Sequence, residues 1–344
     1  MQLEKQVASQ RDLASDAFSF ANSDQHNVLI TRGIERLISS QALSPSAARN
    51  LLRDLICNDT YGKFSELAAY DWITRKDIKI TAQESLTTTE VLGDQGTIID
   101  GRMDFLNIYF EIKAFGFHGF LARRLRERLE QELHGCTVVI EDSWDISIES
   151  FNALIADTKK VAQQLQEKRS FRFGRMGIRI VPPKHVMVSS RTVQLYLLAK
   201  ENAEFPFKSA NQFTRNYPFL LIYVLHPWLN QLSIHDDFAG ADSTFTRAFA
   251  RRAFMQFTQN TQPVSEVCKE ISSPTTFAEA AKLLAGIMFL NVWPADAYPA
   301  DRPESRLVPS WIYLNPRATH KIKHSTMRVF GHQVEIDDFS DDDY

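Results

Sequence analysis

The sequence predicts an α/β fold in which a central mixed sheet is flanked by helices. Two observations support this prediction. Segments with helical periodicity of the apolar residues are interrupted by short segments in which apolar residues alternate or run together, as strands require. Between residues 61 and 142 these segments follow the order α-β-β-β-α-β, with helices over 64–75 and 119–134 and strands over 78–83, 97–105, 109–115 and 137–141.

The sheet is predicted to continue beyond this part of the chain. A helix over 150–168 leads to a strand over 177–181, which ends at Pro182-Pro183 because proline cannot donate to a strand ladder. Two further strands are expected over 193–200 and 219–225, and the second is apolar throughout, which is typical of an interior strand. The rest is predicted to form helices over 244–257 and 277–288 and short strands over 311–314 and 327–336.

These patterns divide the chain into four regions. They are a helical N-terminal segment over 1–58, an α/β domain over 59–230, a mixed helical and strand region over 231–334 and an acidic tail over 335–344. The tail holds six Asp and Glu residues and no base, so the rest of the chain sums to about +3 although the formal net charge is -3. This mildly basic body permits nucleic-acid binding without requiring it.

The composition argues against several classes of protein. Apolar runs fall short of the ~20 residues of a membrane helix, and the first residues lack the apolar core of a secretory signal, so we expect a cytoplasmic protein with no membrane partner. Three widely spaced cysteines argue against a disulfide framework and a paired-cysteine zinc site. Zinc-hydrolase, nucleophilic-serine and nucleotide-binding functions find little support, because HxxxH, GxSxG, phosphate-loop and GxGxxG motifs are missing from the sequence.

One predicted hairpin brings three chemically useful side chains together. An even-length turn centred between Asn107 and Ile108 pairs Asp104 with Glu111, and Lys113 then points to the same side. We expect a four-residue loop, because Ile108 resists the positive φ of a tight turn. Facing carboxylates repel each other on a solvated surface, whereas a bound cation turns the repulsion into coordination. The other face is an apolar set suited to packing on a core: Met103, Phe105, Phe110, Ile112 and Ala114.

These residue types suit a magnesium site. Mg²⁺ prefers carboxylate, backbone carbonyl and water ligands, so Asp104, Glu111 and the carbonyl of Ile112 form a candidate half-site, with Mn²⁺ as the substitute ion. Lys113 is placed to orient the attacking water, while the metal offsets the charge that grows on the phosphate. The hairpin therefore predicts hydrolysis of a phosphodiester.

The segment from 61 to 142, about a quarter of the chain, resembles the PD-(D/E)XK (restriction-endonuclease-like) nuclease superfamily. The core of that group is an α-β-β-β-α-β unit with Asp on the second strand and Glu-x-Lys on the third. The resemblance implies a magnesium-dependent endonuclease, usually acting on DNA, and a supporting Glu on the first helix, a role that Glu66 fits. Met103 stands where the group often has Pro. Because Asp104 and Glu111 are closely spaced, Asp100 on the same strand face stays open as the alternative ligand.

Four arginines in two basic segments are candidates for nucleic-acid binding. The segment 168–184 has six bases, no acid and interleaved phenylalanines, so it suits phosphate binding and base stacking; a solvated loop is the alternative. In the helix over 119–134 the bases alternate with glutamates, which mostly indicates intrahelical ion pairs. The candidates are Arg172 and Arg175 in the first segment and Arg123 and Arg124 in the second.

Two alternative functions stay open beside a DNA nuclease. A nucleic-acid-binding or scaffold protein would keep the fold without the chemistry, and an RNA-directed nuclease would differ in its groove. The resemblance implies contexts such as restriction, phage defence, mobile elements or repair. Cutting both strands at once calls for two active sites, which favours a homodimer or a partner protein.

Overall fold

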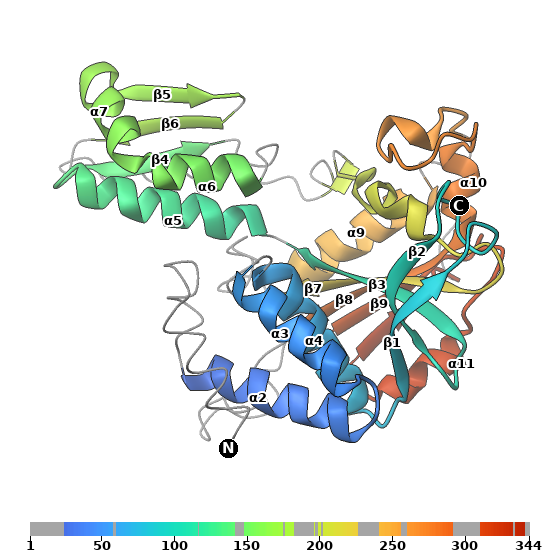
Figure 1. Ribbon diagram of the computed structural model, residues 1–344. Helices are drawn as coiled ribbons and strands as arrows, with labels where there is room; N and C mark the ends of the chain where they lie inside the picture. Colours follow the sequence, from blue (N-terminus) through green and yellow to red (C-terminus); the bar gives the residue numbers. More distant parts are fainter. Residues whose placement is uncertain are drawn as a thin grey trace. The chain divides into compact units, whose positions relative to one another are not determined.

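Figure 1 shows the computed structural model, in which the chain divides into two compact units. The first unit comprises residues 1–114, 194–224 and 240–344, and the second comprises 115–193 and 225–239. The second unit therefore interrupts the first along the sequence. The structure describes residues 24–57, 60–115, 117–141, 148–174, 176–181, 196, 199–200, 202–225, 241–255, 260–291, 310–332 and 334–340.

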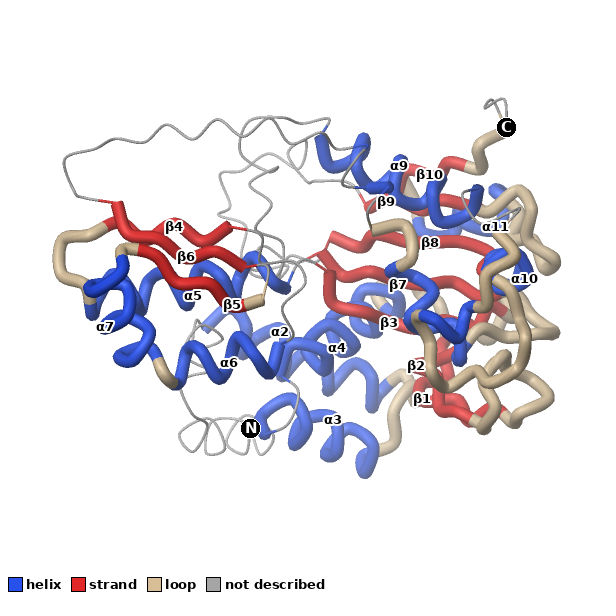
Figure 2. Tube along the Cα trace, turned by 90° about the horizontal axis from the view of Figure 1, so that it is seen from above, coloured by secondary structure: helices blue, strands red, loops and turns tan. Residues whose placement is uncertain are grey.

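The first unit is built on a seven-stranded mixed sheet (Figure 2). Its strand order is β1-β2-β3-β7-β8-β9-β10. The pairs β1–β2, β2–β3 and β8–β9 are antiparallel, and β9–β10 is parallel. The prediction of an α/β fold with a mixed sheet is confirmed. The strands are β1 (Ile80–Leu86), β2 (Thr97–Met103), β3 (Ile108–Phe115), β7 (Phe219–Leu225), β8 (Leu284–Asn291), β9 (Ser310–Leu314) and β10 (Val334–Asp337).

Helices flank this sheet. The N-terminal helices α2 and α3 pack on α4, which also contacts β1, while α9 contacts β8 and β9. None of the helices that the structure describes combines the length and apolar content needed to cross a membrane. The helices are α2 (Asp24–Ser39), α3 (Pro45–Cys57), α4 (Thr60–Thr74), α9 (Ala241–Met255), α10 (Phe277–Leu283) and α11 (His324–Met327), with 3₁₀ helices over Phe205–Gln212, Val264–Glu266 and Arg328–Phe330.

Strands β7, β8 and β9 form the interior of the sheet. Every residue of the three strands is buried. Strands that are covered on both faces are apolar throughout, as FLLIYVL is in β7. Aromatic rings fill the space between sheet and helix, with Tyr223 edge-on to Phe249 at 5.8 Å and 5.4 Å from Phe289. The prediction of an interior strand over 219–225 is confirmed.

The second unit has its own antiparallel sheet, in the order β4-β6-β5. The order α-β-β-β-α-β exists along the sequence, but its last strand does not join β1–β3. All five residues of β4 pair with β6 instead, which buries the apolar side chains of this unit locally. The elements are α5 (Phe117–Glu132), β4 (Thr137–Glu141), α6 (Ile148–Ala156), α7 (Thr158–Lys168), β5 (Ser170–Phe173) and β6 (Met176–Val181).

Four predicted elements differ from the structure. Of the strand expected over 327–336, residues 327–330 are helical and β10 begins only at Val334. The strand expected over 193–200 is wrong, because the residues described there, 196, 199 and 200, are helical. The helix expected over 277–288 ends at Leu283 and the chain continues as β8, because a continuous apolar run has no period that separates a buried helix from a buried strand. The helix expected over 150–168 is divided at Asp157.

The C-terminal region does not form a domain apart from the α/β domain. Strands β8, β9 and β10 belong to the same sheet as β1, β2 and β3, so the predicted boundary near 231 does not hold. The predicted acidic tail also contributes to the fold, since its first residues lie in β10. Asp337 accepts a hydrogen bond from Arg247 Nε at 2.6 Å, and Glu335 accepts one from Trp311 Nε1 at 3.0 Å. These partners are distant in sequence, so the charge run alone did not indicate them.

Candidate active site

The hairpin of β2 and β3 has a different register from the predicted one. Gly101 pairs with Phe110 and Met103 with Ile108, so the pairing of Asp104 with Glu111 is wrong. The four-residue turn is residues 104–107. Asn107 has φ 51°, a conformation that Asn tolerates and a β-branched residue resists, which explains why the strand resumes at Ile108.

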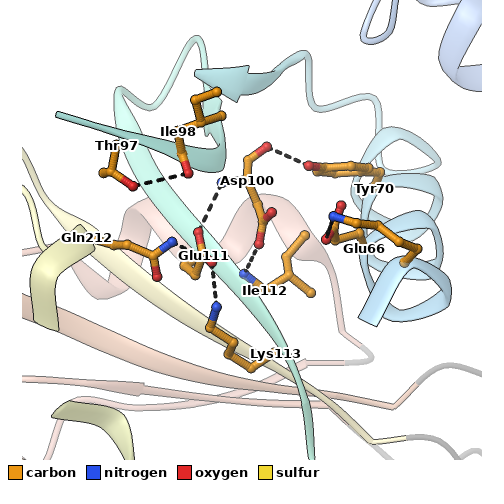
Figure 3. A network of polar contacts seen from close by, with 10 residues as sticks. Glu66, Tyr70, Thr97, Ile98, Asp100, Glu111, Ile112, Lys113 and Gln212 are labelled. Atoms are coloured by element: carbon orange, nitrogen blue, oxygen red, sulfur yellow. Dashed lines mark hydrogen bonds and ion pairs between the residues drawn. The ribbon is translucent and has the colours of Figure 1, made fainter. Parts of the chain in front are cut away.

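The observed register places Asp100 across from Glu111. Two hydrogen bonds link the strands at this position (Figure 3). The Ile112 amide donates to Asp100 Oδ2 at 2.6 Å, and the Asp100 amide donates to Glu111 Oε2 at 3.1 Å. The register differs from the predicted one by an even number of residues, so the side chains keep their faces. Asp100, Glu111 and Lys113 therefore share one face of the hairpin, as the alternative ligand assignment required.

Asp104 lies in the turn, where its Oδ1 accepts a hydrogen bond from Thr81 Oγ1 at 2.8 Å and faces Arg102 Nε at 3.4 Å. These contacts use Asp104 to hold the turn to β1 and β2. Phe105, predicted on the apolar face, is 91% exposed at the turn. Three other residues of the predicted apolar face are buried in the core: Met103, Phe110 and Ile112.

Glu111 is buried and receives hydrogen bonds from three directions. Besides the Asp100 amide, Lys113 Nζ donates to Glu111 Oε1 at 2.6 Å and Gln212 Nε2 donates to the same oxygen at 2.8 Å. Such charge-assisted bonds offset the cost of burying a carboxylate to 4% exposure. Gln212, which comes from outside the hairpin, thus fixes Glu111 at the same oxygen that Lys113 bonds (Figure 3).

Helix α4 brings Glu66 and Tyr70 to the same place. Glu66 is only 7% exposed and pairs with Lys63 one turn earlier. Tyr70, one turn later, donates its hydroxyl to the Asp100 carbonyl at 2.6 Å. Asp100 lies opposite Gln83 of β1, which has φ 55°, and these two residues do not pair in the β1–β2 ladder. Tyr70 therefore supplies the Asp100 carbonyl with a hydrogen bond that the ladder does not. The predicted placement of Glu66 beside the hairpin agrees with this arrangement.

The cluster of acids shifts the protonation of its members. Burial, then the charge of Glu111 and then that of Glu66, raise the pKa of Asp100 well above its ordinary value, against smaller effects of Lys113 and the Ile112 amide. Burial, the largest single effect, lowers the pKa of Lys113, but the charge and hydrogen bond of Glu111 together with the charges of Asp100 and Glu66 outweigh it and leave this pKa raised. Lys113 is therefore an ammonium at neutral pH. Burial and the same three acids raise the pKa of Tyr70, which keeps its hydroxyl a donor.

The donors gathered here are of the kind that a hard divalent cation prefers. Glu66, Asp100 and Glu111 supply carboxylates, and Ile112 supplies a backbone carbonyl. As they are placed, no three His, Cys, Asp or Glu side chains among the described residues form a group that could hold a metal ion. Asp100 and Glu111 each direct oxygens at protein donors instead. The chemical fit to Mg²⁺ rests on the donor types and on the crowding of the acids, since burial and then the charges of Glu111 and Glu66 raise the pKa of Asp100.

Two residues of this cluster were missed by the sequence reasoning. Tyr70 follows Glu66 by four residues on a helix, so the i,i+4 spacing could have indicated it. Gln212 comes from the end of the 3₁₀ helix, 101 residues after Glu111. Backbone bonds hold that segment to the loop after β1, with Leu92 N donating to Phe213 O at 2.9 Å and Gly93 N to Asn211 O at 3.0 Å. No local pattern in the sequence marks such a contact.

The four candidate nucleic-acid-binding arginines all belong to the second unit. Arg172 is exposed on β5. Arg175 lies outside the described residues, and Arg123 and Arg124 lie on α5 with side chains that are likewise outside them. Within the basic segment over 168–184, residues 170–173 form β5 and residues 176–181 form β6, so the strand expected over 177–181 is present and the alternative of a solvated loop is wrong for these residues.

Comparison with known proteins gives no further identification. The chain matches no family model, no curated protein and no solved structure.

Proposed function

We propose that the chain is a metal-dependent endonuclease of the PD-(D/E)XK type that hydrolyses phosphodiester bonds in DNA. The observation that carries the proposal is the meeting of Glu66 of α4 with Asp100, Glu111 and Lys113 of one hairpin face, where Glu66 and Glu111 are buried. Burying like charges together costs stability, and such clusters are found where function requires them. The same residues stand in the order helix Glu, strand Asp, strand Glu-x-Lys that the resemblance implies.

Asp100, Glu111 and the carbonyl of Ile112 are the residues that would hold Mg²⁺, or Mn²⁺ in its place, with Glu66 as a supporting ligand. Asp100 replaces Asp104 in this role because it lies across from Glu111. When bound, the cation supplies Lewis-acid stabilisation of the phosphate.

The remaining chemistry falls to Lys113. Hydrolysis adds the hydroxyl of water to phosphorus and its proton to the leaving oxygen. Because the pKa of Lys113 is raised, its ammonium is a donor that orients the attacking water and offsets charge on the phosphate in the transition state. Glu111 holds the Lys113 ammonium in place, and Gln212 in turn holds Glu111.

The proposal includes the partners that a nuclease needs. Arg123, Arg124, Arg172 and Arg175 would contribute to binding the polyanion, and double-strand cleavage would use a homodimer or a partner protein. The cytoplasm, in a restriction, phage-defence, mobile-element or repair setting, is where we place this activity.

Incubation with supercoiled plasmid, single-stranded DNA and RNA tests the proposal. We expect cleavage with Mg²⁺ or Mn²⁺ and none with EDTA. Asp100→Ala should lose cleavage, whereas Asp104→Ala, which removes a turn contact, should cleave at a rate close to that of the parent. Loss in Asp104→Ala with full activity in Asp100→Ala would overturn the assignment of the ligand. Binding without cleavage of any polymer would favour a scaffold protein over a nuclease.

Removing the Gln212 side chain should lower the metal affinity or activity of the site, while all its charged residues stay in place. Gln212→Ala deletes one donor to Glu111, and loss of such supporting contacts costs about 10- to 100-fold in metal affinity or activity. The titration of cleavage rate against Mg²⁺ concentration should shift to higher concentration. Gln212→Glu, which adds a carboxylate beside Glu111, should be more severe. An unchanged Mg²⁺ dependence in both variants would contradict this role.

A further inference from the structure

The three-stranded sheet of the second unit has one covered face. Helices α5 and α7 contact the sheet, and Figure 1 shows α5 and α6 on one side of it. Residues that pair across the strands share a face, and the pairs Phe171↔Ile178 and Phe173↔Met176 place apolar side chains toward the helices. Val138 of β4, Met176 and Ile178 are buried there. The core of this unit therefore lies on one side of its sheet.

The opposite face is polar and accessible around Ser170, Arg172 and Gly177, while Val139 and Val181 also lie on it and Val181 is buried. The pairs Ser170↔Arg179 and Arg172↔Gly177 define it on β5 and β6. Ser170 and Arg172 are exposed. In the part of the chain that the structure describes, a Cβ placed on Gly177 would meet no heavy atom within 4 Å, so the sheet surface beside Arg172 is accessible.

Two arginines stand close together on this open face. Arg172 and Arg179 occupy diagonal positions on neighbouring strands, where the Cα atoms of the two residues are about 7 to 8 Å apart. Arg179 Nη2 bonds Glu141 Oε1 of β4 at 2.9 Å, and both side chains are partly exposed. Glu141 therefore offsets one of the two positive charges, and Arg172 leaves the face with a net positive charge.

The wider charge distribution supports an anionic partner for this unit. The second unit, residues 115–193 and 225–239, holds 13 Lys and Arg against 11 Asp and Glu, a formal charge of +2, so the rest of the chain carries -5. This insertion therefore attracts a polyanion, whereas the negative charge of the rest of the chain lies in the acidic tail over 335–344. The insertion also follows directly on β3, the strand that carries Glu111 and Lys113.

We propose that the open face of the β4-β6-β5 sheet, through Arg172 and Arg179, binds the phosphate backbone of nucleic acid. The inference rests on the proposed nuclease function and assigns substrate binding to a surface that is distinct from the acidic cluster. Phosphate contacts of this kind position the polymer without reading its sequence. Glu141 competes with phosphate for Arg179, so it restrains binding.

Fluorescence anisotropy of a labelled duplex DNA oligonucleotide with the full chain in EDTA tests this face. Arg172→Glu should weaken binding about tenfold and lower the slope of log affinity against log salt by about one. Glu141→Gln should strengthen binding several-fold, because it releases Arg179 to phosphate. A merely structural role of the pair would not produce that gain. The matched control is Lys160→Glu, the same charge change at an exposed position of α7, which should bind like the parent.

The outcomes separate this inference from the proposed function. If the parent chain cleaves DNA while Arg172→Glu and Glu141→Gln bind it as the parent does, the assignment of the face is wrong and the nuclease function stands. If Lys160→Glu weakens binding as much as Arg172→Glu, the effect comes from net charge and the face is not the site. A parent chain that neither binds nor cleaves any nucleic acid overturns both.

Discussion

Lys113→Ala is expected to reduce metal-dependent cleavage by about 10³-fold, the upper range for losing one donor that stabilises developing charge. The ammonium of Lys113 bonds Glu111 at 2.6 Å and is half-buried, so solvent cannot replace it with the same orientation. Single-turnover cleavage at saturating DNA and Mg²⁺ measures this loss, because it separates the chemical step from binding.

The same substitution should cost only part of the stability. Glu111 loses one charge-assisted hydrogen bond but keeps those from Gln212 and the Asp100 amide, so we expect a loss of about 1.5–3 kcal/mol in the metal-free protein, which leaves the chain folded. Lys282→Ala, at an exposed position of α10, is the control and should change neither property. Normal cleavage by Lys113→Ala would show that Lys113 takes no part in the chemistry. If Lys113→Ala unfolds, Lys113→Met, which keeps the length of the side chain, becomes the informative variant.

The face of the active-site hairpin could be predicted from the sequence, but its register could not. Alternation with period two places Asp100, Glu111 and Lys113 on one side for any even shift of the pairing. The turn decides the shift, and here the turn contains Phe105 and ends at Asn107 in a left-handed conformation. An exposed Phe in a turn runs against the apolar pattern, which is why the pattern pointed to a later turn and to Asp104.

Gly101 contributes to this register in a way that only packing reveals. A Cβ at Gly101 would lie 2.8 Å from the Phe110 ring and 2.7 Å from the Thr81 carbonyl. The glycine therefore allows β1, β2 and the Phe110 ring to approach closely beside Asp100. A glycine inside a strand lowers strand propensity, and the sequence alone gives no sign of this contact.

Strand boundaries were predictable where burial is complete or alternation is clean. The strands β7 and β4 have the bounds expected from their sequences. The sheet to which each strand belongs was harder to predict from the sequence. Strand β4 pairs in the second unit, and β10, which lies in a run of acidic residues, forms an edge of the first sheet. Pairing depends on contacts between segments far apart in the chain, and the local pattern carries no information about them.

Asp100→Asn is expected to abolish cleavage and at the same time stabilise the metal-free protein. The amide keeps the shape of the side chain and an oxygen that can accept from the Ile112 amide. It removes a buried negative charge that Glu111 and Glu66 repel. Stabilising substitutions of this kind contribute about 0.5–2 kcal/mol, and active sites are where function opposes stability.

The sign of the pH dependence follows from the raised pKa of Asp100. The folded protein binds this proton more tightly than the unfolded chain does, whose aspartates titrate near about 3.9. The stabilisation is therefore complete below the unfolded pKa and is lost as pH rises through the folded pKa. The advantage of Asp100→Asn over the parent should grow across that window and then level off.

Thermal unfolding at a series of pH values, in EDTA and with Mg²⁺, measures this difference. Mg²⁺ favours the ionised form of Asp100, so it should raise the melting temperature of the parent and narrow the gap to Asp100→Asn. Asp104→Asn is the matched control, since it weakens contacts with Thr81 and Arg102 and should give no gain. If Asp100→Asn is no more stable than the parent at any pH, the acids do not repel one another in the folded chain, and the electrostatic argument for a cation at this site is lost.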